Sequence, residues 1–332
     1  MKSSKFRSSV MGAMVVILAC CALWSTVADA QESKYPNKPI EVIVPFAAGG
    51  PTDIWTRIVI NDLTKELGVP ISIQYKPGAG SMTGSYYVAK QKPDGYVLLA
   101  ASVSFISAPF LEKESPPYDV LKDFTPIATC IIAPNVLVSH TSSDLTSLDV
   151  VVKLAKESPG KLTCATPGMG TTAHLVLDVF KMHGVDITAV PTKGGNPAAT
   201  SLLGKHVDLA ICMYNAAVPH IKSGAFRILA ASDKMAQEPE ARTFPEKGFP
   251  EAAGLGSWQG FFGPSNLPRP IQDQFAAATR KVIQIPSVKK ALENAGFTLY
   301  YMGPDELRQK MASDYRDLEK IVKAAGIGKY SK

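Results

Sequence analysis

Two glycine-rich turns, about 120 residues apart in the chain, have the composition of anion-binding sites. The first is PFAAGGPTD at residues 45–53 and the second is TPGMGTTAH at residues 166–174; each joins a predicted strand to a predicted helix. Because glycine has no Cβ atom, backbone N–H groups in such turns can approach a ligand closely. The start of the following helix adds unpaired N–H donors and the positive end of the helix dipole. We therefore expect the turns to form two halves of one site for a carboxylate or a phosphate.

The second turn also fits a different class of site. Residues 168–173 match the G-x-G-x-x-A pattern of dinucleotide-binding enzymes. The acidic residue expected about 20 residues further on, which would bind the ribose, is missing, because the next predicted strand runs into Pro191-Thr192-Lys193. The sequence motifs of phosphate-loop NTPases, zincins and serine hydrolases are also missing. An exported enzyme with a nucleotide-type glycine-rich site is therefore the less favoured alternative.

Composition argues against several other functions. The 332 residues carry a formal net charge of +6 without a cluster of basic and aromatic residues, which favours solubility over nucleic-acid binding. The histidines and cysteines form no pair with metal-ligand spacing, so we expect neither a metal nor a cofactor. Cys130, Cys164 and Cys212 lie in apolar segments typical of buried thiols. Whether any two of them form a disulfide is left open.

Residues 1–30 have the three parts of a secretory signal peptide. Three basic residues precede an apolar run over residues 10–24, and small residues follow at Ala28 and Ala30. The apolar run is interrupted too early for a secure membrane span. We expect cleavage after Ala30 and a periplasmic location. A lipoprotein acylated at Cys20 is the minor alternative.

The rest of the chain alternates predicted strands and helices, which is typical of doubly wound α/β folds with right-handed crossovers. A proline-rich stretch at residues 115–126 interrupts the alternation and marks the way into a second domain. The predicted strands cover residues 40–44, 71–75, 96–101, 135–139, 162–165, 187–190, 207–211, 226–231 and 257–262. The predicted helices cover residues 54–67, a segment ending at Val88, residues 147–157, 171–182 and 197–203, and three segments beginning near Pro270, Ser287 and Pro304.

The order of these motifs closely resembles the Bug-type periplasmic receptors of tripartite tricarboxylate transporters. The resemblance covers residues 35 to about 327. It rests on several short motifs in the same order: YP and KPI at 35–40, GGPTD at 49–53, KPGAG at 76–80, PDGY at 93–96, PYD and LKDFTP at 117–126, the turn at 168–174, KGG and PA at 193–198, VD at 207–208, PHIK at 219–222, and Trp258 with Gly260.

The resemblance implies a type II periplasmic-binding-protein fold, with two doubly wound α/β domains, crossing strands and a ligand cleft between the domains. It implies a first domain built from residues 31–132 and 255–332, and a second domain built from residues 133–254. The implied function is that of an extracytoplasmic solute receptor, without catalytic activity, which delivers a small organic carboxylate to the membrane permease subunits of such a transporter. We expect a monomer. A receptor that reports its ligand to a signalling partner is the alternative.

By position, the resemblance also implies a set of ligand-binding residues, which grip a carboxylate through backbone amides, small hydroxyls and water. Asp53 equally suits a helix N-cap, His174 equally suits a residue that fixes its loop, and Lys193 equally suits a solvated charge. We expect Asp208 to be a structural partner. The implied set is Phe46, Ala47, Ala48, Asp53, Gly80, Ser81, Ser102, Ser104, Thr166, Gly170, Thr171, Thr172, His174, Lys193 and Gly194.

Two departures from the family pattern bear on specificity. Cys212 stands where many relatives carry an acidic residue that can meet a ligand amino group, which argues against an amino-acid ligand. Phe105 stands where relatives often have histidine, which predicts a more apolar cleft. The sequence does not decide between aliphatic, tricarboxylic and aromatic carboxylates.

Overall fold

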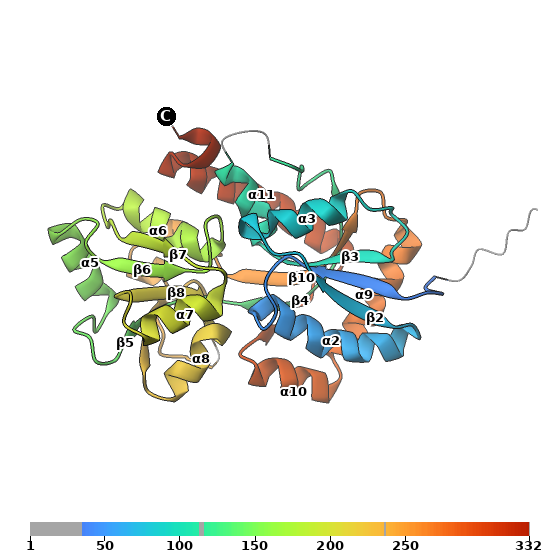
Figure 1. Cartoon of the computed structure of the whole chain (residues 1–332), viewed down its shortest axis with the longest axis horizontal. Coiled ribbons are helices and arrows are strands. Elements are labelled where there is room, and N and C mark those ends of the chain that lie inside the picture. Colours follow the sequence, from blue (N-terminus) through green and yellow to red (C-terminus); the bar gives the residue numbers. More distant parts are fainter. Residues whose placement is uncertain (1–34, 113–115, 236, 332) are drawn as a thin grey trace, which may run out of the picture. The chain divides into compact units, whose positions relative to one another are not determined.

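The computed structural model describes residues 35–112, 116–235 and 237–331 (Figure 1). The predicted signal peptide and Cys20 lie outside these residues. Within the described part from residue 38 onward, the chain forms two sheets, each covered by helices. The first sheet has six strands in the order β11–β4–β10–β3–β1–β2 and the second has five in the order β7–β6–β8–β5–β9.

The strands of the first sheet come from both ends of the described chain. They are β1 (Ile40–Val44), β2 (Ile71–Tyr75), β3 (Val97–Ser102), β4 (Phe124–Ala133), β10 (Ser257–Pro264) and β11 (Thr298–Leu299). The strands of the second sheet are consecutive. They are β5 (Asn135–His140), β6 (Thr163–Thr166), β7 (Thr188–Pro191), β8 (Leu209–Met213) and β9 (Phe226–Ala231).

The helices follow the predicted alternation, and most of their ends lie within two or three residues of the expected positions. They are α2 (Pro51–Leu67), α3 (Met82–Ala89), α4 (Ser104–Ser107), α5 (Leu148–Glu157), α6 (Thr172–Met182), α7 (Gly195–Leu203), α8 (Tyr214–Lys222), α9 (Arg269–Ile283), α10 (Pro286–Asn294) and α11 (Pro304–Ala325). Short 3₁₀ turns occur at η1 (Ala79–Ser81), η2 (Ala108–Leu111), η3 (Pro245–Lys247), η4 (Pro250–Ala252) and η5 (Gly328–Tyr330).

The apolar periodicity of the sequence explains which faces are buried. Trp55, Val59 and Leu63 recur at helical spacing along α2 and are all fully buried. Trp55 packs edge-on against Phe261 of β10, with ring centroids 5.0 Å apart. Gly68 ends this helix in a left-handed conformation, with φ of 72°, and its N–H donates to the carbonyl of Thr64. In Figure 1, α2 and α10 lie below the first sheet and α3 lies above it.

The second sheet is covered on both faces, as its strand β8 shows. Leu209 and Ile211 belong to one apolar cluster with side chains of α5 and α6, while Ala210 and Cys212 belong to another with side chains of α7 and α8. Successive side chains of a strand point to opposite faces, so this alternation buries the strand on both sides. Cys130, Cys164 and Cys212 are free and buried, and we call them the three buried thiols.

Both sheets are mixed rather than wholly parallel. β1 pairs in parallel with β2 and β3, as expected for the first three predicted strands. β10 then pairs antiparallel with β3 and β4, and β5 pairs antiparallel with β8 and β9. The antiparallel strands are the ones through which the chain passes from one sheet to the other.

Two segments connect the sheets, and they are hydrogen-bonded to each other. β4 leads through Pro134 into β5, and residues 232–256 lead from β9 back to β10. The backbone N–H of Asn135 donates to Ser232 Oγ at 3.0 Å, and the N–H of Ser232 donates to the carbonyl of Asn135 at 2.8 Å. The sheet changes between β4 and β5 and again between β9 and β10, near the predicted domain boundaries. The exact boundaries at residues 132 and 254 stay a prediction.

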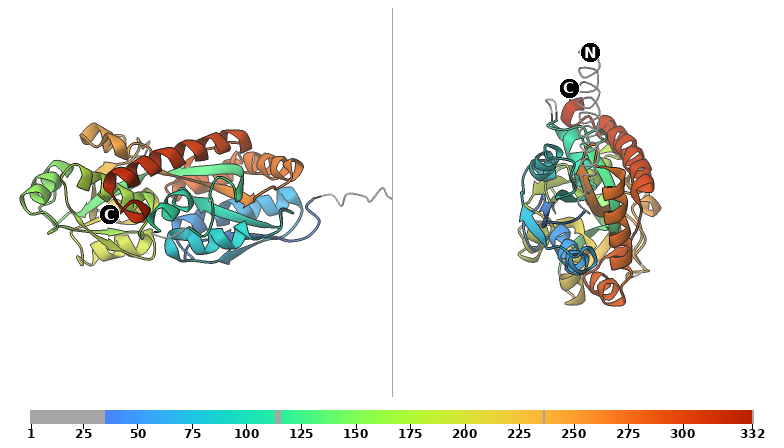
Figure 2. Two further views of the ribbon diagram at one scale, coloured as in Figure 1. Left: turned by 90° about the horizontal axis from the view of Figure 1, so that it is seen from above. Right: turned by 90° about the vertical axis from the view of Figure 1, so that its right-hand side faces the viewer.

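The C-terminal helices pack mainly on the first domain. α9 contacts α2 and β4, and α10 contacts α2. α11 contacts β4 and also α6 of the second sheet, so it spans both domains, as the long red helix in Figure 2 shows. In the part of the chain that the structure describes, no helix has the length and apolar character required to cross a bilayer.

Three elements differ from the sequence prediction. Residues 124–133 form the long strand β4 rather than an irregular connection, and Pro126 fits because the ladder with β10 shifts register beside its partner Phe262. Residues 214–222 form α8, which tolerates Pro219 in its second half. Residues 104–107 form the short helix α4 directly after β3.

Candidate functional site

A cavity of about 120 Å³ lies between the two domains. Its walls come from the loop after β1 and the start of α2, from the end of β3 and the start of β5, and from the loops that precede α6 and α7. The residues that line it are Phe46, Ala47, Ala48, Gly50, Pro51, Thr52, Ser104, Asn135, Pro167, Thr171, Thr172, Ala173, Lys193, Gly194, Gly195, Asn196, Pro197 and Met213.

Three helix N-termini meet at this cavity: those of α2, α6 and α7. In these helices the first N–H groups that donate to a helix carbonyl are those of Ile54, Leu175 and Ala198. Apart from the N–H of His174, which the N-cap side chain accepts, the preceding N–H groups have no partner in their own helix. The three dipoles place partial positive charge at one point, and Lys193 adds a full positive charge. This arrangement suits an anion held by backbone donors.

Glycine is required where the loops turn into α6 and α7. Gly168 has φ of 140° and Gly194 has φ of 133°, a region that L side chains rarely adopt. Gly194 is the N-cap of α7, whereas α6 is capped by Thr171, whose Oγ accepts from the N–H of His174 at 3.2 Å. The same hydroxyl donates to the carbonyl of Gly168 at 2.9 Å, which fixes the turn before the helix.

A buried side chain on β10 holds the polar wall of the first domain. Gln259 is fully buried, and its Oε1 accepts hydrogen bonds from Thr52 Oγ1 at 2.8 Å and from Trp55 Nε1 at 2.7 Å. Its Nε2 donates to Met213 Sδ at 3.2 Å. Thr52 and Met213 line the cavity from different domains, so one residue on a crossing strand positions both of them.

Asn135, the first residue of β5, holds the polar wall of the second domain. Its Nδ2 donates to Thr172 Oγ1 at 2.9 Å and to the carbonyl of Leu255 at 2.6 Å. Leu255 lies in the segment that returns to β10, so this amide connects both crossing segments to the start of α6. Asn135 is 1% exposed, and its hydrogen bonds are therefore shielded from competing water.

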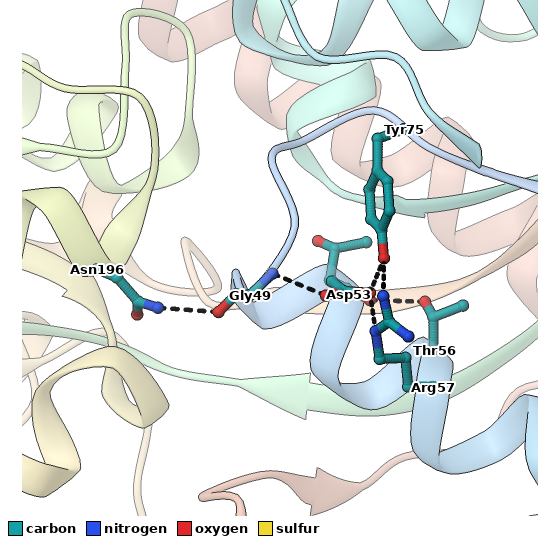
Figure 3. A network of polar contacts seen from close by, with 7 residues as sticks. Gly49, Asp53, Thr56, Arg57, Tyr75 and Asn196 are labelled. Atoms are coloured by element: carbon teal, nitrogen blue, oxygen red, sulfur yellow. Dashed lines mark hydrogen bonds and ion pairs between the residues drawn. The ribbon is translucent and has the colours of Figure 1, made fainter. Parts of the chain in front are cut away.

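The carboxylate of Asp53 fixes the first loop (residues 46–50) rather than lining the cavity (Figure 3). It accepts from the N–H of Gly49 at 2.7 Å, from Arg57 Nε at 2.8 Å and from the hydroxyl of Tyr75 at 2.7 Å. The carbonyl of Gly49 in turn accepts from Asn196 Nδ2 of the second domain at 2.9 Å. Asp53 therefore fixes a loop that is hydrogen-bonded to the opposite domain. Its bonds to Arg57 raise the pKa of that guanidinium.

Two predicted residues, Gly80 and Gly170, lie where the backbones of the two domains are close together. A Cβ atom on Gly80 would stand 2.8 Å from the carbonyl oxygen of Met169, and one on Gly170 would stand 3.0 Å from Ala108 Cα. The hydroxyl of Ser107 donates to the carbonyl of Gly170 across the same gap. Glycine at these positions lets the backbones of the two domains touch, which is a different role from lining the cavity.

His174 and Asp178 form a buried pair behind the cavity, on the same face of α6. His174 Nε2 lies 4.0 Å from Asp178 Oδ2, which is too far for a hydrogen bond, and His174 Nδ1 lies 3.4 Å from Thr166 Oγ1. Burial lowers the pKa of His174 to about 4 and raises the pKa of Asp178 to about 6. Among the described residues, Asp178 Oδ2 has no hydrogen-bond partner. His174 therefore supports the loop as a neutral side chain.

The predicted residues fall into two groups. Several line the cavity: Phe46, Ala47, Ala48, Ser104, Thr171, Thr172, Lys193 and Gly194. The others lie around it and are not among the described lining residues: Asp53, Gly80, Ser81, Ser102, Thr166, Gly170 and His174. In this second group Ser102 Oγ accepts from the N–H of Ser104 at 3.4 Å, and Ser81 is buried in the turn before α3.

The structure adds lining residues that the sequence analysis did not name, of which Thr52, Asn135, Asn196 and Met213 carry polar atoms or sulfur. Thr52 lies within the first glycine-rich turn, directly before Asp53, and Asn196 lies two residues after Gly194, so a wider selection from the two loops would have included them. Asn135 follows the crossing of the chain from the first sheet to the second, and Met213 ends β8; the local sequence does not indicate that either position faces the cavity.

Two specificity arguments from the sequence need correction. Cys212 is fully buried, and the cavity residue at the end of β8 is its neighbour Met213. Phe105 is also fully buried and packs against Phe124 and Phe262 in the core, with ring centroids 5.4 and 4.8 Å away. Phe105 therefore does not make the cavity apolar. Asp208 is a structural partner, as expected, because its Oδ2 accepts from the N–H and hydroxyl of Thr163.

Two α/β domains, two crossing segments and a cavity between the domains define a solute receptor of the periplasmic-binding-protein type. Comparison with known proteins gives the family. The model of the tripartite tricarboxylate transporter family receptor, TctC, matches residues 55–327. The chain belongs to this family of solute receptors.

Individual relatives agree with this assignment. Protein BugT of Bordetella pertussis is 33% identical over 296 residues, which are 88% of this chain and 90% of BugT. The solved structure of R. palustris Rpa4515 with adipate is 28% identical, with a TM-score of 0.81, over 89% of this chain and 99% of that one. MatC (Rpa3494) from Rhodopseudomonas palustris, solved with bound malate, is 28% identical, with a TM-score of 0.78, over 87% of this chain and 100% of that one.

Proposed function

We propose that this receptor binds a small organic carboxylate in the cavity between its domains and delivers it to the permease subunits of a tripartite tricarboxylate-type transporter. The observation that carries the proposal is the convergence of three helix N-termini and Lys193 on one cavity shared by both domains. Relatives of the same fold hold adipate and malate, which are both carboxylates.

The proposal includes how the protein reaches its ligand. Residues 1–30 act as a signal peptide that is removed after Ala30, and the mature monomer works in the periplasm. It carries out no chemistry on the ligand. The ligand carboxylate accepts hydrogen bonds from N–H groups at the starts of α2, α6 and α7, with Lys193 at the cavity edge.

The polar contacts around the cavity support a binding role for the loops. The first loop is fixed by Asp53. The loops before α6 and α7 are fixed by Thr171 and by the hydroxyl of Thr192, whose single proton is shared between the carbonyl oxygens of Thr166 and Gly194 at 2.9 and 2.8 Å. A ligand that accepts from both sides of the cavity favours the arrangement in which the domains lie together, because it binds that arrangement more tightly.

The test is thermal unfolding of the mature chain, residues 31–332, after unfolding and refolding to remove any carried ligand. The panel contains aliphatic, hydroxy, tricarboxylic and aromatic carboxylates, together with amino acids and nucleotides. A ligand present at 100 times its Kd adds about 2.7 kcal/mol to the free energy of unfolding, which gives a clear shift in Tm. A saturable shift with carboxylates supports the proposal, and a response to nucleotides alone refutes it.

A pair of variants tests the site itself. Lys193→Gln removes the positive charge at the cavity, and we expect Kd for the best carboxylate to rise about two- to fivefold because the side chain is exposed and screened. The matched control is Lys161→Gln, which removes an exposed lysine of the same domain and should leave Kd unchanged. Equal effects of the two substitutions would refute the placement of the anion.

A further inference from the structure

The cavity has an apolar lining to which both domains contribute. Phe46 and Pro51 supply it from the first domain, and Pro167, Pro197 and Met213 supply it from the second. Alanine side chains at positions 47, 48 and 173 extend the same surface. A ligand group against this wall loses its water and receives no hydrogen bond in return, so the wall favours an apolar group and disfavours a charged one.

Several side-chain donors at the cavity are already used inside the protein. Thr52 donates to Gln259 Oε1, and Thr171 donates to the carbonyl of Gly168. Both hydrogen bonds of Asn135 Nδ2 go to other protein atoms. Asn196 Nδ2 donates to the carbonyl of Gly49. Among the described lining residues, the donors not used in this way are the hydroxyls of Ser104 and Thr172, the ammonium group of Lys193 and the second N–H of Asn196 Nδ2.

The charges at the cavity also limit which charged groups a ligand can carry. Lys193 is the charged residue among the described residues that line it, and no aspartate or glutamate belongs to that set. A ligand ammonium group would therefore lack a carboxylate partner. A second ligand carboxylate would find no second positively charged side chain among the described lining residues. An unpaired charge in such surroundings is strongly disfavoured.

The size of the cavity limits the ligand further. Its volume is about 120 Å³. An apolar protein cavity of about 150 Å³ accommodates one benzene molecule. The space therefore suits a body of a few carbon atoms or a single small ring, and a tricarboxylate would fill it with charged groups.

From these observations we infer that the ligand is a monocarboxylate with a compact apolar body, and not a di- or tricarboxylate or an amino acid. This inference rests on the proposed function, because it assumes that a carboxylate occupies the helix N-termini. The carboxylate then binds the backbone donors and Lys193, and the apolar body lies against Phe46 and Met213.

The test uses pairs of ligands that differ in one group, with isothermal titration of the refolded mature chain. Pentanoate is compared with glutarate, which has the same five carbons and a second carboxylate, and benzoate is compared with terephthalate. Norvaline adds an amino group to pentanoate. We expect at least one monocarboxylate to bind about tenfold or more tightly than its dicarboxylate partner, and pentanoate to bind about tenfold or more tightly than norvaline.

The outcomes separate this inference from the function on which it rests. Tighter binding of glutarate, terephthalate, adipate or malate than of the monocarboxylates would overturn the inference and leave the carboxylate receptor intact. Norvaline binding as tightly as pentanoate would overturn the exclusion of amino acids. Absence of binding by every carboxylate in the panel would overturn both proposals.

A variant pair tests the apolar wall directly. Phe46→Lys places a positive charge on the wall, and we expect it to improve glutarate binding about fivefold or more relative to pentanoate, because the second carboxylate gains a partner. Phe46→Leu keeps the wall apolar and should preserve the order of the ligands. Phe46 is part of a partly exposed loop, so a folded variant is expected, and circular dichroism checks this. If Phe46→Lys leaves the glutarate-to-pentanoate ratio unchanged, the inference is wrong.

Discussion

Gly80 allows a strong test of how domain contact supports ligand binding. It has φ of +62°, and a Cβ atom there would stand 2.8 Å from Met169 O and 3.2 Å from Ala108 Cβ. Met169 belongs to the opposite domain, and its carbonyl is backbone, so neither side can yield by rotating a side chain. The Gly80→Ala substitution therefore forces the two domains apart by a few tenths of an ångström, or shifts the turn before α6.

The expected magnitude has two parts. Forcing an extra methyl group into a packed contact costs about 1 to 3 kcal/mol, and here that strain arises only when the domains are together. Since the ligand binds the arrangement with the domains together, Kd should rise about 5- to 150-fold. The left-handed backbone of alanine adds about 1 to 2 kcal/mol of strain that is independent of ligand.

Gly68→Ala separates these two effects. Gly68 has a similar φ of +72°, and a Cβ atom there meets nothing within 4 Å. This control should lose stability through backbone strain alone and keep its Kd. The assays are urea unfolding for stability and isothermal titration with the carboxylate that stabilises the parent protein most. If both variants lose the same stability and bind equally tightly, the contact between Gly80 and Met169 has no role in binding.

Three further predictions concern buried groups. Gln259→Leu leaves the buried donors of Thr52 and Trp55 unpaired, so urea unfolding should show a loss of about 2 to 4 kcal/mol, and a loss below 1 kcal/mol would contradict the network. Burial raises the pKa of Asp178 to about 6, so the folded state binds the carboxyl proton more tightly than the unfolded state does. The stability that this bound proton contributes is present below about pH 4 and is lost as pH rises to about 6. Asp178→Asn should therefore gain stability relative to the parent at pH 7.5 compared with pH 4.5, and the same difference in stability at both pH values would refute the assignment. Burial raises the pKa of each of the three buried thiols, so a thiol reagent should label none of them in the native mature chain and three in urea, and a single reactive thiol in urea would reveal a disulfide.

Much of the secondary structure could be predicted because local rules act without conflict. The strand at residues 40–44 and the end of α2 at Gly68 follow from an apolar run and a glycine stop. The prediction from sequence was wrong at two segments in which a proline lies inside a regular element. Pro126 lies beside a register shift in β4, and Pro219 lies within α8. In both cases pairing or packing with distant segments outweighs the local preference.

The sequence predicted the parts of the site that come from short continuous motifs, but not the parts that come from distant segments. The glycine-rich loops were visible as motifs, and both of them contribute to the cavity. Within those motifs, however, the sequence does not say which side chains turn toward the cavity. The carboxylate of Asp53 instead accepts a hydrogen bond from the N–H of Gly49 in the first loop, and His174 is buried beside Thr166. Asn135 and Gln259 lie on strands next to the two sheet crossings, and Met213 ends β8, so their positions at the site depend on the topology of the whole chain.

The position of β10 between β3 and β4 has a consequence for the order in which the chain acquires structure. All strands of the second sheet lie between residues 135 and 231, so that sheet can form as soon as this stretch has been synthesised. The first sheet lacks a central strand until residue 264 has been made, and until then the facing edges of β3 and β4 have no partner. A chain that folds from its N-terminus would therefore complete the second sheet before the first, with the facing edges of β3 and β4 unpaired until β10 is present.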